Sequence, residues 1–218
     1  MSVRVGLTRA ELLATVLVVV LAVVGVLALW PSGPVAIDQP AGGGSPIAMP
    51  SDADLAGARA AAALPACPGS GSDGVAASGP LAHIRVPCLG RPGDVKPAEG
   101  LAGRDALLNV WASWCAPCRA ELPALAAYAA RPDAVPVLGI DLRDRPSAAL
   151  ELLTSLGVRL PVVVDTDEAI ARTLKVTALP SSYLLRADGS VARVQPAIPF
   201  RSADEVADAV SRLRRPDR

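Results

Sequence analysis

This chain has no net formal charge, few aromatic residues and a single histidine. Each of these features argues against some classes of function. The 21 basic residues balance the 21 acidic ones, so electrostatics give no argument for a nucleic-acid or acidic partner. His83 is the only histidine, and we expect it to be a surface or edge residue rather than a metal ligand or a base. Aromatic residues make up 3% of the chain, and two of them, Trp111 and Trp114, lie beside a Cys-x-x-Cys motif.

One long hydrophobic run is present near the N-terminus. Residues 12–30 are 19 positions without a charge, and as a helix they would span about 28 Å, close to the hydrocarbon core of a bilayer. Arg4 and Arg9 precede the run, and no basic residue follows it until Arg59. The positive-inside rule therefore predicts a cytoplasmic N-terminus (1–11), a single-pass anchor in the cell membrane and an extracytoplasmic domain after it. The alternative is a cleaved signal peptide, although the run is longer than a usual signal-peptide core.

The segment after this run is rich in proline, glycine and alanine, which supply 22 of the 36 positions in 31–66. Such a composition buries too little apolar surface to offset its ordering entropy, so we expect 31–64 to be a flexible linker. One or two helical turns can form over 52–64, where Ser51 could cap the first turn. A linker of about 30 residues has a reach near 30 Å, which would keep the next domain close to the membrane.

Cys67 and Cys88 flank a short predicted strand, 82–86. In an oxidising compartment two such cysteines are usually joined. A disulfide that closes a loop of about 20 residues can stabilise a protein by ~3 kcal/mol in the chain-entropy model. We therefore predict a structural disulfide here. The alternatives are a second redox pair that relays electrons, or free or metal-bound cysteines.

Another pair of cysteines lies between an apolar run and a helical pattern. The run at 106–112 suits a buried strand. After the motif, apolar residues recur at helical spacing at Leu122, Leu125, Ala126 and Ala129. Cys115 would therefore lie at the first turn of a helix, where unpaired N–H groups and the helix dipole stabilise a thiolate. Cys118 would lie on the same side, one turn deeper, so the arrangement predicts thiol–disulfide exchange.

The same Cys-x-x-Cys spacing also occurs in zinc sites, which need two further ligands. The candidates Cys67, Cys88 and His83 lie more than 26 residues upstream, and the chain has no second Cys-x-x-Cys and no His-x-x-x-His. No Cys-x-x-Cys-His sequence for haem attachment is present either. We therefore predict no metal and no cofactor at this site.

The rest of the domain alternates strands and helices and ends in an antiparallel hairpin. Pro146 and Gly157 bound one helix, an Asp-Gly pair at Asp188 marks the hairpin turn, and Ser202 with Glu205 forms a capping-box pattern before the last helix. Strands are predicted at 106–112, 135–142, 160–164, 182–186 and 191–195, and helices at 115–130, 146–156, 168–174 and from 202 onward. This order predicts an α/β layer fold with a central mixed sheet flanked by helices.

The string Asn-x-Trp-Ala-Ser-Trp-Cys-x-Pro-Cys-x-x-Glu-x-Pro at 109–123 resembles the TlpA/ResA branch of thioredoxin-fold proteins. Members of that branch are membrane-anchored, extracytoplasmic thiol-disulfide oxidoreductases of the cytochrome c maturation type. Asn109 stands where thioredoxin carries a buried Asp, and Glu121 stands where this branch carries an active-site carboxylate. The resemblance covers about residues 65–215 and implies a thioredoxin-like domain there.

The resemblance also implies roles for individual residues. Cys115 would attack the substrate and Cys118 would resolve the mixed disulfide. Glu121 would shuttle the proton of Cys118, the alternative being a solvated carboxylate that pairs with an Arg. Pro180 would be cis and pack against the cysteines. The residues expected to bind substrate are Trp114, Ala116, Pro117, Leu179 and Pro180.

The segment Ala116-Pro117 lacks the histidine that strongly oxidising relatives carry between their cysteines, which favours a reductase. By resemblance, its substrates would be exported cysteine-containing proteins such as apocytochrome c. Its electrons would come from a membrane donor of the CcdA/DsbD type. The alternatives are a general disulfide oxidase or isomerase and, from another class, a metal-binding chaperone on the same fold.

Overall fold

The computed structural model describes residues 20–21, 50–69 and 77–214 of the 218-residue chain. The chain divides into two compact units, Met1–Gly44 and Ser45–Arg218, and nearly all described residues belong to the second. The predicted anchor at 12–30 lies outside the described residues, apart from the helical pair at 20–21. In the part of the chain that the structure describes, no helix is both long and apolar enough to cross a bilayer. The anchor therefore stays a prediction.

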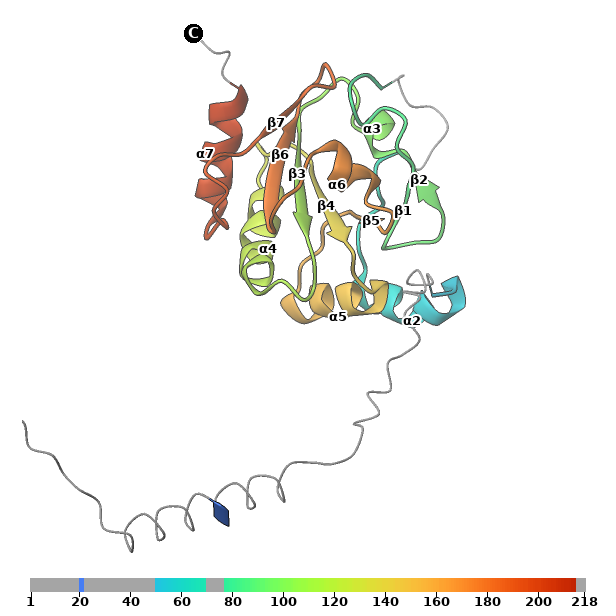
Figure 1. Ribbon diagram of the computed structural model, residues 1–218. Coiled ribbons are helices and arrows are strands. Elements are labelled where there is room, and N and C mark those ends of the chain that lie inside the picture. Colours follow the sequence, from blue (N-terminus) through green and yellow to red (C-terminus); the bar gives the residue numbers. More distant parts are fainter. Residues whose placement is uncertain (1–19, 22–49, 70–76, 215–218) are drawn as a thin grey trace, which may run out of the picture. The chain divides into compact units, whose positions relative to one another are not determined.

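A five-stranded mixed sheet lies at the centre of the second unit (Figure 1). Its strands follow the order β5-β4-β3-β6-β7. Strands β3, β4 and β5 are parallel, whereas β6 pairs antiparallel with β3 and β7 pairs antiparallel with β6. The bounds are Ala106–Trp111 for β3, Val137–Leu142 for β4, Val162–Asp165 for β5, Ser181–Leu185 for β6 and Val191–Arg193 for β7. All five strands lie within two residues of their predicted bounds, so the predicted mixed sheet is confirmed.

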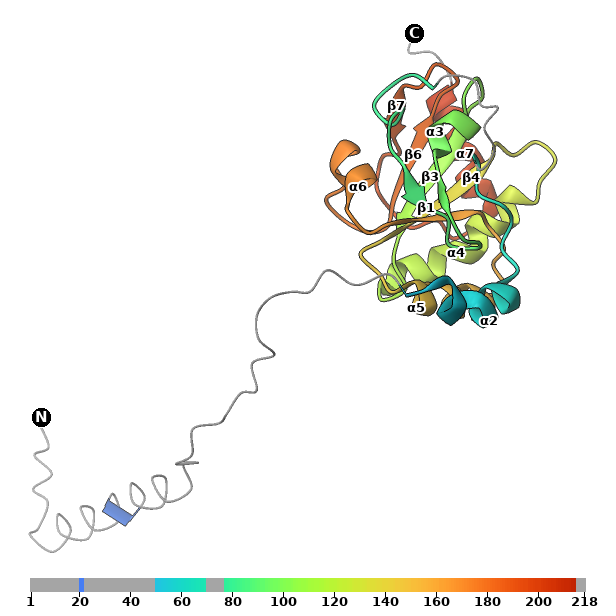
Figure 2. The same ribbon diagram turned by 90° about the vertical axis from the view of Figure 1, so that its right-hand side faces the viewer.

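Helices cover both faces of this sheet (Figures 1 and 2). Helices α4 (Ala116–Ala129), α5 (Pro146–Leu156) and α7 (Ala203–Arg214) pack on one face, and α3 (Pro97–Gly100) and α6 (Ala169–Thr173) pack on the other. Because side chains alternate along a strand, β3 supplies both cores: Trp111 packs with the first group of helices and Val110 with the second. The predicted α/β layers are confirmed.

Helix α5 illustrates how local sequence sets the ends of an element. Pro146 occupies the first helical turn, where a missing N–H removes no helical hydrogen bond. Gly157 closes the helix in the left-handed conformation, with φ of 64°, which glycine adopts without steric penalty. Both ends match the prediction.

Helix α2 (Asp52–Ala62) lies inside the range predicted to be a flexible linker. Ser51 and Asp54 form a capping box at its start. Leu55 is buried in the same core as α5, and the Arg59 side chain donates to the Leu89 carbonyl at 3.0 Å. The helical turns predicted here, with Ser51 as their cap, are confirmed, whereas the prediction of a flexible linker is wrong for 52–62. Composition alone indicated a tether, whereas one buried leucine and a long-range hydrogen bond attach this helix to the domain.

The segment before β3 also differs from the prediction. The structure has a small hairpin of β1 (Val86–Pro87) and β2 (Asp94–Val95) instead of a strand over 82–86. Turn hydrogen bonds occupy most of that range, since Ala82 N–H donates to Gly79 O and Ile84 N–H donates to Leu81 O. His83 is exposed, as expected.

Cys67 and Cys88 are joined by a disulfide, with Cα atoms 5.9 Å apart. Both residues are buried, and Cys88 forms an isolated bridge with Val163 of β5. The bond therefore attaches the chain that follows α2 to the edge strand of the sheet.

Candidate active site

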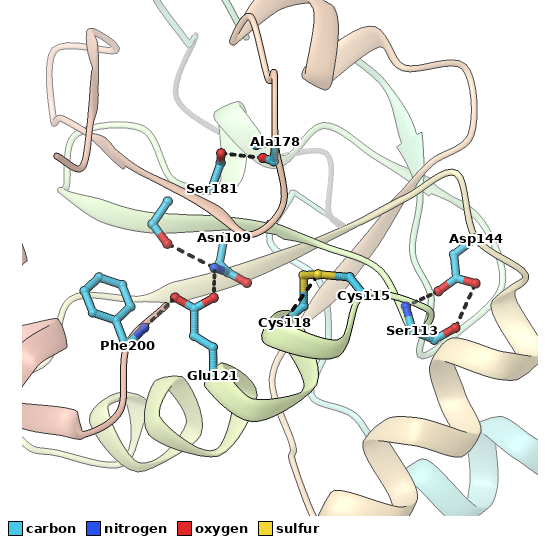
Figure 3. The surroundings of a disulfide bond; sticks show 10 residues. Asn109, Ser113, Cys115, Cys118, Glu121, Asp144, Ala178, Ser181 and Phe200 are labelled. Carbon is cyan, nitrogen blue, oxygen red and sulfur yellow. Dashed lines mark hydrogen bonds between the residues drawn. A yellow bond between two sulfur atoms is a disulfide. The ribbon is translucent and has the colours of Figure 1, made fainter. Parts of the chain in front are cut away.

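Strand β3 and helix α4 bring Cys115 and Cys118 to one end of the sheet. Cys115 is the N-cap of α4, and Cys118 lies in its first turn. The two are joined by a disulfide, with Cα atoms 5.3 Å apart, and the Cys118 N–H donates to the Cys115 sulfur at 3.2 Å (Figure 3). Cys115 is 6% exposed, whereas Cys118 is fully buried. A sulfur atom from another molecule can therefore approach Cys115 more readily than Cys118.

The start of α4 is also electrostatically suited to a thiolate. The first N–H groups of a helix have no partner within the helix, and the helix dipole places positive charge there. One of these groups, the Cys118 N–H, already points at the Cys115 sulfur. When the disulfide opens, this N–H can donate to a Cys115 thiolate, which favours the ionised nucleophile.

A groove of about 420 Å³ lies beside Cys115. Trp114 forms part of its wall, is 63% exposed, and donates its indole N–H to Arg143 O at 3.3 Å. The remaining lining residues come from the start of α4, the end of β4 and the segment before β6: Pro117, Leu142, Arg143, Val176, Thr177, Ala178 and Leu179. The groove is largely apolar and reaches the accessible sulfur, so it can accept an extended polypeptide.

The Leu179–Pro180 peptide bond is cis, as predicted. Pro180 is buried and directly precedes β6. The Ser181 hydroxyl donates to Ala178 O at 2.7 Å, which closes the turn around the proline (Figure 3).

Glu121 is buried one helical turn beyond Cys118. Its Oε2 accepts a hydrogen bond from the Asn109 amide at 3.2 Å, and its Oε1 accepts one from the Phe200 N–H at 3.2 Å (Figure 3). Burial raises the pKa of Glu121 from 4.5 to about 7, and these two hydrogen bonds lower it only partly. Among the described residues Glu121 forms no ion pair, so the alternative of a solvated carboxylate paired with an arginine is wrong.

The loop before Cys115 is held by a second carboxyl group. Asp144, which follows β4, accepts hydrogen bonds from the Ser113 N–H and from the Ser113 hydroxyl, the latter at 2.9 Å. Figure 3 places Asp144 and Ser113 on one side of the disulfide and Glu121 with Asn109 on the other. Acidic groups therefore flank the disulfide on two sides.

Comparisons with known proteins point to a redox family. The AhpC/TSA family model matches residues 91–194. Thiol-disulfide oxidoreductase ResA of Bacillus subtilis (strain 168) is 31% identical over 96 residues, which are 43% of this chain and 54% of ResA. The DsbE homolog of Paracoccus denitrificans (strain Pd 1222), a thiol:disulfide interchange protein, is 40% identical over 86 residues, 39% of this chain and 46% of that protein.

Solved structures are also similar to this chain, and we describe one whose own chain is matched over nearly its whole length. It is a secreted Mycobacterium tuberculosis disulfide oxidoreductase described as homologous to E. coli DsbE, with 30% sequence identity and a TM-score of 0.51. The match covers 59% of this chain and 95% of that one.

This chain belongs to the thioredoxin-fold AhpC/TSA family. The assignment confirms the predicted thioredoxin-like fold and the resemblance to ResA-type proteins. This chain spans about half the length of the curated relatives it matches.

The structure of this AhpC/TSA family member brings together most of the predicted site. Trp114, Pro117 and Leu179 line the groove beside Cys115. Pro180 instead lines a small cavity that it shares with Glu121. Ala116 is exposed and lines neither space.

Two residues of the candidate site, Asp144 and Phe200, were not predicted from the sequence. Asp144 follows the carboxyl end of a parallel strand, which is where α/β sheets gather their functional groups, and that signal could have found it. Phe200 acts on Glu121 through its backbone N–H alone, so no residue-type pattern could have indicated it.

Proposed function

We propose that this chain is a thiol-disulfide oxidoreductase that reduces disulfides in exported proteins, with apocytochrome c as a client. One observation carries the proposal: the Cys115 sulfur is the N-cap of α4, accepts the Cys118 N–H, and opens on a groove. This placement combines an accessible sulfur, a stabilised thiolate and a resolving partner within one helical turn.

The reaction balances as a two-electron, two-proton exchange. In the reduced chain, the Cys115 thiolate attacks one sulfur of the substrate disulfide, and the other substrate sulfur leaves as a thiolate and takes a proton. Cys118 then loses its proton and attacks the Cys115 sulfur, which forms the internal disulfide and releases the second substrate thiolate. The substrate has gained the two electrons that the cysteine pair has lost. Once both of its thiolates are protonated it has also gained two protons, one from Cys118 and one that Cys115 had already released on ionising.

In this cycle Glu121 takes the proton of Cys118. Its pKa of about 7 leaves both protonation states populated near neutral pH, as a general base and acid requires. Its position one turn along α4 from Cys118 and its burial keep the exchanged proton away from bulk water.

The reducing direction and the extracytoplasmic location belong to the same proposal. Ala116 and Pro117 place no histidine between the cysteines, which supports a reductase. The uncharged run at 12–30 supports a single-pass membrane anchor. The relatives named ResA and DsbE support a redox role, and the similar secreted oxidoreductase of Mycobacterium tuberculosis supports export. Regeneration would come from a membrane electron donor of the CcdA/DsbD type.

The reduction potential of the Cys115–Cys118 couple tests this direction. The full chain in detergent is equilibrated with dithiothreitol or glutathione buffers, and the change is followed by tryptophan fluorescence, since Trp114 adjoins the pair. A value near or below about −230 mV is expected for a reductase, and a value near about −120 mV would place the chain among disulfide-forming oxidases.

A further inference from the structure

Asp141 carries a buried carboxyl group that has no role in the chemistry above. It lies in β4, where it pairs in register with Trp111 of β3, and it is fully buried. Neither of its carboxyl oxygens accepts a hydrogen bond from a donor in the described chain. Native structures leave few buried polar groups without partners, and an ionised carboxylate in this position would be strongly disfavoured by desolvation.

Asp141 interacts with the carboxyl group of Asp144. Burial, followed by the charge and hydrogen bonding of Asp144, raises the pKa of Asp141 well above its usual range. Asp144 already serves as an acceptor, for the N–H and the hydroxyl of Ser113 and for the Arg145 N–H at 2.7 Å. When two carboxyl groups meet, a hydrogen bond between them requires that one keep its proton, and Asp141 is the one with no donor to stabilise its charge.

We propose that the Asp141 carboxyl donates a hydrogen bond to the carboxylate of Asp144 and thereby positions Cys115 through Ser113. The proposal rests on the nucleophilic role of Cys115 proposed above. It makes Asp141 and Asp144 positioning residues of the reaction, because neither carboxyl touches the reacting sulfur atoms.

The positioning acts through two loops. Ser113 lies two residues before Cys115, and Asp144 holds both its N–H and its hydroxyl. The neighbouring Trp114 indole donates to Arg143 O. The loop that follows β4 therefore holds the loop that precedes α4 at three points, immediately before the attacking cysteine.

Other titratable groups around the pair do not replace this contact. Glu121 projects from α4 on the Cys118 side of the disulfide (Figure 3). Asp165 of β5 pairs in register with Leu142, so it faces the opposite side of the sheet, where the Ile170 and Ala171 N–H groups donate to it. The Arg143 guanidinium pairs with Glu168. Among the described residues, Asp144 is the only charged group that shifts the pKa of Asp141.

Loss of the shared proton would change the site in a defined direction. With the proton, the pair carries one negative charge and Asp144 is oriented toward Ser113. Without it, two carboxylates repel each other, the hold on Ser113 weakens, and more negative charge lies near Cys115, which disfavours its thiolate. We therefore expect Cys115 to become less reactive when the Asp141 donor is removed.

The test compares Asp141→Asn with Asp141→Leu in the reduced full chain. The rate of Cys115 alkylation by iodoacetamide is measured at neutral pH, and the thiolate absorbance is titrated. Asparagine keeps a neutral donor of the same shape, so alkylation within about twofold of the wild type is expected, whereas the leucine variant should react about fivefold more slowly because a donor is lost. If both variants react like the wild type, or if the asparagine variant is slowed as well, the proposal is wrong.

A second comparison keeps the proposal testable if Asp141→Leu does not fold. Wild type and Asp141→Asn are alkylated from mildly acidic to alkaline pH. Because only the wild type can lose the proton, its rate should fall relative to the variant as the pH rises, and a constant ratio would overturn the proposal. The proposed function is scored separately by disulfide reduction in an insulin assay, since alkylation reports the state of Cys115 even in a chain that reduces no substrate.

Discussion

The Asn109 amide nitrogen donates a hydrogen bond to Glu121 Oε2 at 3.2 Å and so links strand β3 to helix α4 beneath the cysteine pair. The same nitrogen donates to the Ser182 hydroxyl at 3.0 Å, so β6 fixes the orientation of the amide. These contacts hold a carboxyl group in a buried position where its pKa is about 7. The site therefore combines a redox pair with an acid–base group that titrates near neutral pH.

Replacing Cys115 and replacing Cys118 should block different steps of the reaction. Cys115→Ser removes the attacking sulfur, so insulin reduction should fall by at least about a thousandfold. Cys118→Ser keeps the nucleophile but not the resolving thiol, so a mixed disulfide with substrate should accumulate and be visible on a non-reducing gel. If Cys115→Ser rather than Cys118→Ser accumulates the mixed disulfide, the assigned roles are reversed.

Glu121→Gln is expected to remove a pH dependence of stability. Burial raises the pKa of Glu121 from 4.5 to about 7, so the folded chain binds this proton more tightly than the unfolded chain. The free energy of unfolding should therefore be highest below pH 4.5 and fall as the pH rises to about 7, by roughly 3 kcal/mol. Urea unfolding of the oxidised variant should lack this contribution, so its stability should fall less steeply with pH than that of the wild type. Burial also raises the pKa values of Asp141 and Asp165, and these two carboxyl groups add to the slope in both proteins.

The exposed helix residue Glu151 provides the matched control. Glu151→Gln removes an ordinary carboxylate from α5 and should retain the whole pH dependence. A wild type whose stability is flat across this range would contradict the raised pKa of Glu121.

The Cys67–Cys88 disulfide is expected to be structural. Replacing both residues, Cys67→Ala with Cys88→Ala, removes a crosslink between positions separated by 21 in sequence. The free energy of unfolding in urea should fall by about 3 kcal/mol, with insulin reduction unchanged in the folded variant. A folded double variant that has lost turnover would instead support the alternative of an electron relay.

Helix α2 is expected to contribute to the stability of the domain. Leu55 is 2% exposed, so Leu55→Ala should lower the free energy of unfolding by about 3 kcal/mol through lost burial and a residual cavity. Ala56→Ser, on the exposed side of the same helix, should change it by less than about 0.5 kcal/mol. Equal effects of the two changes would mean that α2 does not stabilise the domain through its buried face.

Patterns that act locally predicted most of the domain. The apolar run before Cys115, the Pro146 and Gly157 helix ends and the Asp-Gly turn after β6 each depend on neighbouring residues, and each fixed its element to within two residues. Contacts between distant segments were not predictable in this way. In the sequence, Leu55 is a single apolar residue in a segment whose composition is typical of a linker. It is buried because it packs against α5, which is distant in the sequence.

The same distinction between local patterns and contacts of distant segments applies to the candidate site. Cys115, Cys118 and Glu121 share one short motif and one helix, so their proximity follows from helical spacing. Asp141 and Asp144 lie at least 20 residues later in the chain. They reach the site because β4 is the parallel neighbour of β3, a pairing that no local pattern encodes.

Asn109→Leu is expected to shift the pH profile of the resolving step. The Asn109 hydrogen bond lowers the pKa of Glu121, so its loss should raise that pKa further. In a single turnover, the rate at which the Cys115–Cys118 disulfide re-forms should therefore rise with pH at a higher pH than in the wild type. Ser182→Ala is the control, because it removes the other partner of the amide and leaves the bond to Glu121 in place, and its profile should move less. If Asn109→Leu keeps the wild-type profile while Glu121→Gln abolishes it, Glu121 carries the proton but Asn109 does not tune it.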